Sequence, residues 1–253
     1  MFKQLLLPLA LVTAAPGVLM AQGGFRWPDK AQNLKALPPE TGGQRLSQIM
    51  RGFTGALGVR CEYCHKGQGG DLSQFDFVSD EKPAKEKARL MIKMVQAING
   101  THLAGLADLG VAADRRVSVT CTTCHRGIAK PMTLDAVLAE TIEAEGADAA
   151  VNQYQQLRGR YYGSAAYDFS RGVLTNLGER LSQAGKNAEA VKMVELELSA
   201  NGEDFRTLAS LGGIQVRAGD KDKGLATLKK ALDLAPDNAK QFIQNQIDRA
   251  SRP

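Results

Sequence analysis

Two short stretches decide how this chain is organised: Cys61-Glu62-Tyr63-Cys64-His65 and its near copy, Cys121-Thr122-Thr123-Cys124-His125. Each reads C-x-x-C-H, the attachment pattern of c-type haem. In this pattern the two thiols add across the two vinyl groups of haem, and the adjacent histidine lies beneath the iron as its proximal ligand. The sequence therefore predicts two haem c groups. The predicted attachment residues are Cys61, Cys64, Cys121 and Cys124, and the predicted proximal iron ligands are His65 and His125.

The two motifs use all 4 cysteines of the chain and two of its 3 histidines. The alternative is a four-cysteine zinc site built from two C-x-x-C pairs. Such a site does not need a histidine after each pair, and it favours a shorter gap than the one from Cys64 to Cys121. A thioredoxin-like redox pair needs only one motif. The repeated histidine therefore favours covalent haem.

A six-coordinate c-type haem needs a second axial ligand, usually Met or His. For the first haem the candidate is Met50, which lies eleven residues before Cys61 on a predicted helix, Gln44 to about Phe53. For the second haem we favour Met91, with Met94 and His102 as the alternatives. Ordinary core packing is the other role open to each methionine, since Met fills irregular gaps.

The segment Leu57-Gly58-Val59-Arg60 followed by the first motif, with Met50 upstream, resembles a haem segment of the cytochrome c subunit of photosynthetic reaction centres. So does Ala88-Arg89-Leu90-Met91, followed by Val119-Thr120 and the second motif. In that family a helix carrying Met precedes a turn and C-x-x-C-H. The resemblance covers about residues 40–132, and it implies Met50 and Met91 as axial ligands.

This chain departs from that family in its number of haems, in having no anchor cysteine and in carrying a repeat tail. The family's subunit carries four haems, is often lipid-anchored and has no repeats. The resemblance therefore implies the fold of the haem pair, and it does not imply a role in photosynthesis.

The second half of the chain repeats with a period of 34 residues, the helix–turn–helix period of tetratricopeptide repeats. Gly178 and Gly212 take the small position where the two helices of a repeat approach each other. The other matched positions are Leu174 with Leu208, Leu177 with Leu211, Ala184 with Ala218, Gly185 with Gly219, Ala190 with Gly224, and Leu198 with Leu232. Upstream, two more helices are predicted at Thr133 to Glu145 and Ala147 to Leu157; they are out of register with this period and form either a degenerate repeat or a connector. Four tyrosines before the first clear repeat, Tyr154, Tyr161, Tyr162 and Tyr167, are expected to pack between helices.

We therefore expect a mainly α protein: a small haem-packed c-type cytochrome domain followed by an α-helical tetratricopeptide-like repeat domain. The expected boundaries are 1–21 for a signal peptide, 22–132 for the dihaem domain and 133–253 for the connector and repeats. In the dihaem domain a helix from Pro83 to about Ile98 is expected to turn an apolar face, with Leu90, Met91 and Met94, toward the core. Residues 1–21 combine Lys3 with a short apolar run broken by Pro8, which is typical of a secretory signal and too short for a stable membrane anchor.

The formal net charge of +5 falls to +4 without residues 1–21, and the propionates of two haems would bring it near zero. No basic stripe with interleaved aromatics indicates nucleic-acid binding. The expected function is single-electron transfer in the periplasm or outside the cell, with redox partner proteins and with docking or self-association through the repeats. A dihaem peroxidase and a subunit of a haem-bearing filament are the alternatives; methionine candidates for both irons argue against the enzyme without excluding it.

Overall fold

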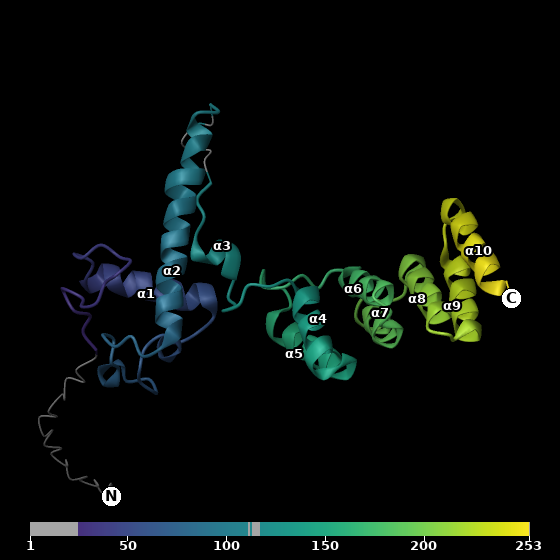
Figure 1. Ribbon diagram of the computed structural model, residues 1–253, viewed down its shortest axis with the longest axis horizontal. Helices are drawn as coiled ribbons and strands as arrows, with labels where there is room; N and C mark the ends of the chain where they lie inside the picture. Colours follow the sequence, from purple (N-terminus) through teal and green to yellow (C-terminus); the bar gives the residue numbers. More distant parts are fainter. Residues whose placement is uncertain (1–24, 111, 113–116, 253) are drawn as a thin grey trace, which may run out of the picture. The chain divides into compact units, whose positions relative to one another are not determined.

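The computed structural model describes residues 25–110, 112 and 117–252 (Figure 1). Within these residues the chain forms ten α-helices joined by turns and loops, without strands, which confirms the predicted mainly α class. The helices are α1 (Gly43–Leu57), α2 (Pro83–Ala97), α3 (Cys121–His125), α4 (Leu134–Glu145), α5 (Ala147–Tyr161), α6 (Val173–Gln183), α7 (Asn187–Asn201), α8 (Phe205–Arg217), α9 (Lys221–Leu234) and α10 (Asp237–Ser251). The predicted signal peptide, residues 1–21, lies outside the described residues. None of the described helices is long and apolar enough to span a bilayer.

The chain forms two compact units. The first contains the described part of Met1–Arg51 together with Arg60–Gln96, and the second contains the described parts of Gly52–Val59 and Ala97–Pro253. The first C-x-x-C-H motif and Met50 thus belong to one unit, and the second motif belongs to the other with all the later helices. The domain boundaries at residues 21 and 132 stay predictions.

Helix α2 begins at Pro83 as expected, and among its residues the side chain of Arg89 is buried. Leu90, Met91 and Met94 are 56%, 42% and 43% exposed, whereas Arg89 is only 6% exposed. The Arg89 guanidinium is satisfied by the Asp80 carboxylate at 2.8 Å and by the carbonyl of Asn33 at 3.1 Å. A buried charge is tolerated when it is paired and hydrogen-bonded, which accounts for the burial of Arg89.

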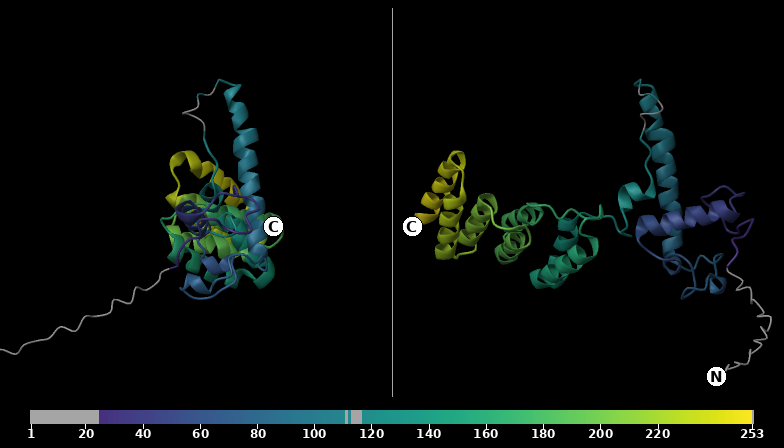
Figure 2. Two further views of the ribbon diagram at one scale, coloured as in Figure 1. Left: turned by 90° about the vertical axis from the view of Figure 1, so that its left-hand side faces the viewer. Right: turned by 180° about the vertical axis from the view of Figure 1, so that it is seen from behind.

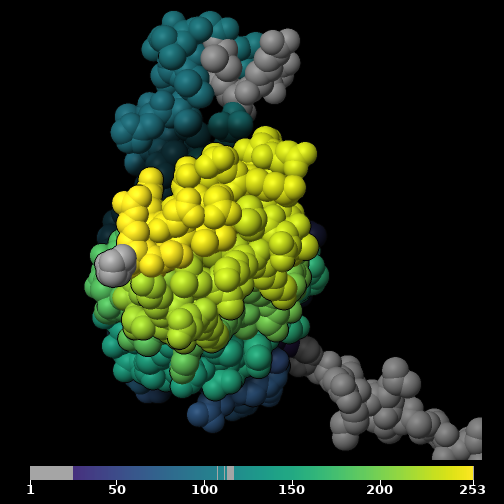
Figure 3. Space-filling view, turned by 90° about the vertical axis from the view of Figure 1, so that its right-hand side faces the viewer, coloured from purple at the N-terminus to yellow at the C-terminus, as the bar shows by residue number. Residues whose placement is uncertain are grey.

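In the second unit α4 and α5, α6 and α7, and α8 and α9 pair as successive helical hairpins, and α10 packs on the last of them (Figures 1 and 2). Two clusters of buried side chains hold these helices together. Met193 is fully buried in the first cluster beside Val194, so its role is core packing. In the space-filling view the atoms of α9 and α10 form a closely packed surface at the C-terminal end (Figure 3).

The tyrosine cluster packs as predicted and includes one residue that the periodicity did not indicate. Phe169 lies edge-on to Tyr154 with ring centroids 5.8 Å apart, and Tyr161 and Tyr167 form a second edge-on pair at 5.4 Å. Tyr154 and Phe169 are buried, whereas Tyr162 is 66% exposed. These rings therefore fill the space between the connector helices and the first repeat hairpin.

Gly178 and Gly212 occupy the closest approach between paired helices, as their sequence positions predicted. A Cβ atom on Gly178 would lie 2.5 Å from Cγ2 of Val194, and one on Gly212 would lie 2.7 Å from Cγ of Leu228 and 2.9 Å from the carbonyl oxygen of Gly224. Real side chains almost never reach such distances. The two hairpins thus depend on glycine at equivalent positions.

We predict that Gly212→Ala lowers the free energy of unfolding by about 1–3 kcal/mol, because the added methyl group overpacks the contact between α8 and α9. Gly213→Ala is the matched control: its Cβ would meet only the ends of flexible side chains, at 3.7 Å. Removing a helical glycine there should be neutral or stabilising by up to ~1 kcal/mol. Urea unfolding followed by circular dichroism measures both variants. Equal effects of the two substitutions would contradict the packing argument.

Candidate haem sites

The first motif is a tight helical turn with both thiols on one side. Cys61–Tyr63 is a 3₁₀ turn, and the carbonyl of Cys61 accepts hydrogen bonds from the backbone N–H of Cys64 at 3.2 Å and of His65 at 3.0 Å. Side chains three residues apart eclipse each other in a 3₁₀ turn, so Cys61 and Cys64 point the same way. Both are free thiols. This is the arrangement that two thioether bonds to one macrocycle require.

The second motif forms the short helix α3, Cys121–His125. Its first turn is fixed by Thr120, whose backbone N–H donates to Oγ1 of Thr123 at 3.0 Å. Its last turn ends at Arg126, which adopts the left-handed conformation with φ +48°. Such a C-terminal residue closes the carbonyl end of a helix and redirects the chain. Here the redirected chain returns to the histidine of the motif.

The Nδ1 atom of His125 lies 2.9 Å from the carbonyl oxygen of Ile128. A carbonyl can only accept a hydrogen bond, so Nδ1 carries the proton and donates it. In neutral imidazole the other nitrogen, Nε2, then holds the free lone pair that a metal needs. The loop is held in place by Gly127, whose N–H donates to the carbonyl of Ala56 at 2.8 Å. The hydrogen bond at Nδ1 of His125 thus selects the neutral tautomer in which Nε2 can bind a metal.

The same loop explains why position 58, just before the first motif, is occupied by glycine. Gly58 has φ +65°, and a Cβ there would lie 2.0 Å from the carbonyl oxygen of Gly127. Only glycine allows both this conformation and this approach. The end of α1 therefore packs directly against the loop that positions the ligand of the second motif.

His65 in the first motif has different surroundings. Its Nδ1 is buried and has no hydrogen-bond partner among the described residues. The imidazole lies edge-on to Phe77, with ring centroids 5.0 Å apart, and Phe75 stacks on Phe77 at 5.6 Å. Phe25 extends this aromatic group on the other side of Phe77. The ring of His65 is therefore positioned by packing, where that of His125 is positioned by a hydrogen bond.

Burial, followed by the positive charges of Lys85 and Arg89, lowers the pKa of His65 to about 4. Asp76 opposes this shift, and Lys82 adds to it. At neutral pH the imidazole is thus uncharged, and metal ligation needs this form.

The loop from Phe77 to Lys82 precedes α2 and is held at Asp80. The Asp80 carboxylate contacts Arg89, Lys35 at 2.7 Å and Lys85 at 3.1 Å, and these contacts hold its pKa well below the usual range. Lys85 also donates to the carbonyls of three residues of the same loop. Sequence analysis missed this cluster, because no local pattern connects Asp80 to Lys35.

The predicted methionine ligands lie on two helices. Met50 is half-buried on α1, in the same compact unit as the first motif. Met91 and its alternative Met94 are exposed on α2, and the alternative His102 is exposed on the π-helical turn Ile98–His102. The assignment of a methionine to each iron stays a prediction. Within each motif, two free thiols and the adjacent histidine form a donor set that fits one covalent haem.

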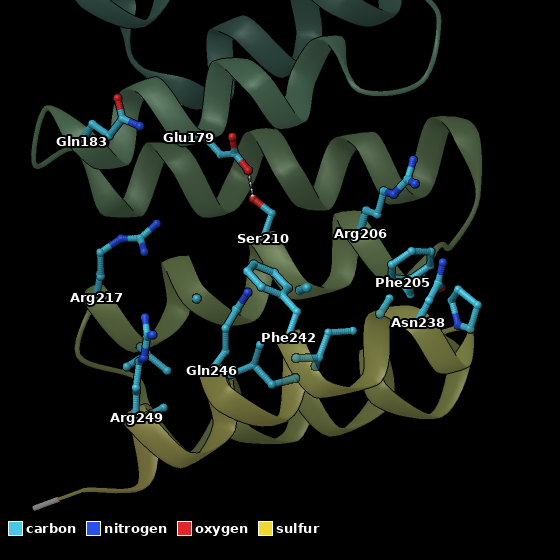
Figure 4. Close-up of a pocket in the computed structure, with 18 residues that line it drawn as sticks. Glu179, Gln183, Phe205, Arg206, Ser210, Arg217, Asn238, Phe242, Gln246 and Arg249 are labelled. Carbon is cyan, nitrogen blue, oxygen red and sulfur yellow. Dashed lines mark hydrogen bonds between the residues drawn. The ribbon is translucent and has the colours of Figure 1, made fainter.

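A groove with a volume of about 1040 Å³ lies in the second unit, between α6, α8 and α10 (Figure 4). Arg217 and Arg249 lie at one end of this groove and Arg206 at the other, with Phe242 between them (Figure 4). Phe242 is 65% exposed, so an apolar ring faces solvent inside the groove.

The charge of this groove is positive. Its one acidic lining residue, Glu179, accepts a hydrogen bond from Ser210 at 2.9 Å. None of the three arginines forms an ion pair within the described part of the chain. Arg217 donates a hydrogen bond to Ser182 at 2.9 Å, and Arg206 lies over the ring of Phe205. Three guanidinium groups without a carboxylate partner near an exposed aromatic ring make a surface suited to acidic and apolar side chains.

The segment of the chain that holds both motifs is similar to known cytochromes. Residues 40–145 match the family described as photosynthetic reaction centre cytochrome C subunit. The photosynthetic reaction center cytochrome c subunit of Rubrivivax gelatinosus is 32% identical over 109 residues, covering 38% of this chain and 28% of the relative. Cytochrome c-554 of Chloroflexus aurantiacus is 29% identical over 109 residues, covering 43% of this chain and 23% of the relative. The chain thus spans about a quarter of the length of each relative, and the cytochrome c part of the sequence prediction is confirmed.

Proposed function

We propose that this chain is an exported dihaem c-type cytochrome that carries single electrons. The observation that supports this best is the pair of C-x-x-C-H turns, each with free thiols beside a histidine suited to iron. Cys61 and Cys64 would hold one haem and Cys121 and Cys124 the other. His65 and His125 would be the proximal ligands. Bound haem supplies an iron centre that gains or loses one electron.

The protein would orient the histidine ligands and supply the second axial ligands. Packing at Phe77 and the hydrogen bond to Ile128 orient the two imidazoles. Met50 and Met91 would complete the coordination and keep other ligands from the iron. A fixed coordination sphere suits electron transfer, whereas a peroxidase needs an iron with an open position. An electron carrier is therefore favoured over the dihaem peroxidase, which the proposed ligands disfavour.

The compartment follows from the predicted signal at residues 1–21 and from the chemistry of the motifs. Haem c is attached outside the bacterial cytoplasm, so the periplasm or the cell exterior is the proposed location. In that oxidising compartment four unprotected thiols would form disulfides. Attachment to haem removes all four thiols from that chemistry.

The repeat segment is proposed to dock a protein partner. Its groove contains Arg206, Arg217, Arg249 and the exposed Phe242, so the occupant that fits is an acidic segment with apolar side chains. Self-association into a haem-bearing filament is the alternative use of this surface. The haem segment would then exchange electrons with redox partners while the repeats hold the complex.

The first prediction concerns the number of haems. Correctly matured protein should retain two haems per chain after denaturation, because thioether bonds survive unfolding. The double variant Cys61→Ala, Cys64→Ala should retain one. The absorbance of the alkaline pyridine complex measures both, with Ser73→Ala as the control. Matured protein that contains zinc and lacks a Soret band would contradict the proposal.

A second prediction concerns the axial ligands. Met50→Ala should remove the methionine-to-iron charge-transfer band of one haem and lower its reduction potential, and Met91→Ala should do the same for the other. Met193→Ala is the control, since this methionine is buried in the repeat core and should affect stability only. If Met91→Ala leaves the spectrum unchanged and Met94→Ala or His102→Ala alters it, the assignment of Met91 is wrong.

A third prediction concerns docking. A fluorescent peptide of glutamates with interspersed phenylalanines should bind the repeat segment, and Arg249→Glu should weaken this binding at least about tenfold, an effect that decreases with salt. Lys229→Glu is the matched control, because Lys229 is exposed on α9 outside the groove. Equal losses in both variants would indicate only a general charge effect. Sedimentation that shows a mass increase with concentration, abolished by Arg249→Glu, would assign the groove to a second copy instead.

A further inference from the structure

The two predicted haem sites differ in the groups that face their histidines. In the second site, Nδ1–H of His125 donates to the carbonyl of Ile128 at 2.9 Å. In the first, Nδ1 of His65 is buried and has no hydrogen-bond partner among the described residues, and the ring lies edge-on to Phe77. A hydrogen bond from the distant ring nitrogen raises the basicity of an imidazole ligand. His125 should therefore be the stronger donor to iron.

The charges around the first site and its weaker histidine ligand both favour a higher reduction potential there. Lys82, Lys85 and Arg89 all act on His65, with Asp76 opposing them. Lys85 and Arg89 share the single Asp80 carboxylate with Lys35, so their positive charges are only partly offset. Lys82 has no carboxylate partner in the described chain; its ammonium group donates to the backbone carbonyl of Glu62, inside the motif itself.

An uncompensated positive charge beside an iron site disfavours the ferric form, which carries one more positive charge than the ferrous form. At the second site the adjacent cation, Arg126, is exposed, so solvent and salt screen its effect. The strength of the histidine ligand and the local charge thus both predict different reduction potentials for the two sites.

We propose that the haem held by Cys61 and Cys64 has the higher reduction potential and the haem held by Cys121 and Cys124 the lower. This inference rests on the proposed dihaem function. The first electron that a redox partner gives to the fully oxidised holoprotein would go to the site of Cys61 and Cys64, and the second would go to the site of Cys121 and Cys124. Lys82 would contribute to the upper potential by its charge, together with Lys85 and Arg89.

The test is a spectroelectrochemical titration of the full-length holoprotein, after its haem count has been measured. Two one-electron steps should be separated by at least a tenfold difference in equilibrium constant, about 59 mV. Lys82→Gln should lower the upper step and leave the lower step in place. Lys82→Arg should restore the upper step, because it keeps the charge. Lys87→Gln is the matched control: Lys87 is exposed on α2 and is not among the charges that act on His65.

The outcomes separate this inference from the proposed function. Two haems with coincident potentials would overturn the inference and leave the dihaem function standing. The same holds if Lys82→Gln moves the lower step, or if Lys87→Gln moves the upper step as much as Lys82→Gln does. A haem count below two would overturn the proposed function and the inference with it. The separation in the unsubstituted protein needs no variant, so a Lys82 variant that fails to fold does not remove the test.

Discussion

The Asp80 carboxylate is the contact on which the surroundings of the first motif depend. It pairs with the buried Arg89 and also binds Lys35 and Lys85, so it joins the N-terminal arm, its own loop and α2. That loop carries Phe77 against the ring of His65. Burying a guanidinium without such a partner would cost several kcal/mol. The position of the ligand therefore follows from a charge pair that lies outside the motif.

The second motif positions its histidine through a contact within the same short segment of the chain. The left-handed residue after α3 turns the chain so that the carbonyl of Ile128 meets His125, three residues away. A backbone acceptor orients the imidazole and strengthens it as a ligand, whereas the ring packing at His65 only orients it. Two copies of one motif thus become two chemically different sites, which suits a chain proposed to hold electrons at two potentials.

The repeat helices are held by close helix–helix contacts, whereas the surroundings of the first haem motif are held by charge pairs. Gly178 and Gly212 let paired helices approach until their partners' side chains lie where a Cβ would be. This packing leaves the groove between α6, α8 and α10 open, with Arg206 and Arg249 free of ion pairs. A rigid hairpin stack with an unpaired positive groove can hold a partner without any redox group of its own.

The sequence by itself determined the haem motifs, the mainly α class and the glycines at the hairpin contacts, because thiol spacing and helical periodicity are local properties. Only the tertiary structure decided the surroundings of the two imidazoles: a backbone carbonyl beside Nδ1 of His125, and the ring of Phe77 edge-on to the ring of His65. It also decided that α2 buries Arg89 beside Asp80. Periodicity assigns a charged residue to solvent, but a carboxylate supplied by a loop outside the helix can satisfy that charge in the interior.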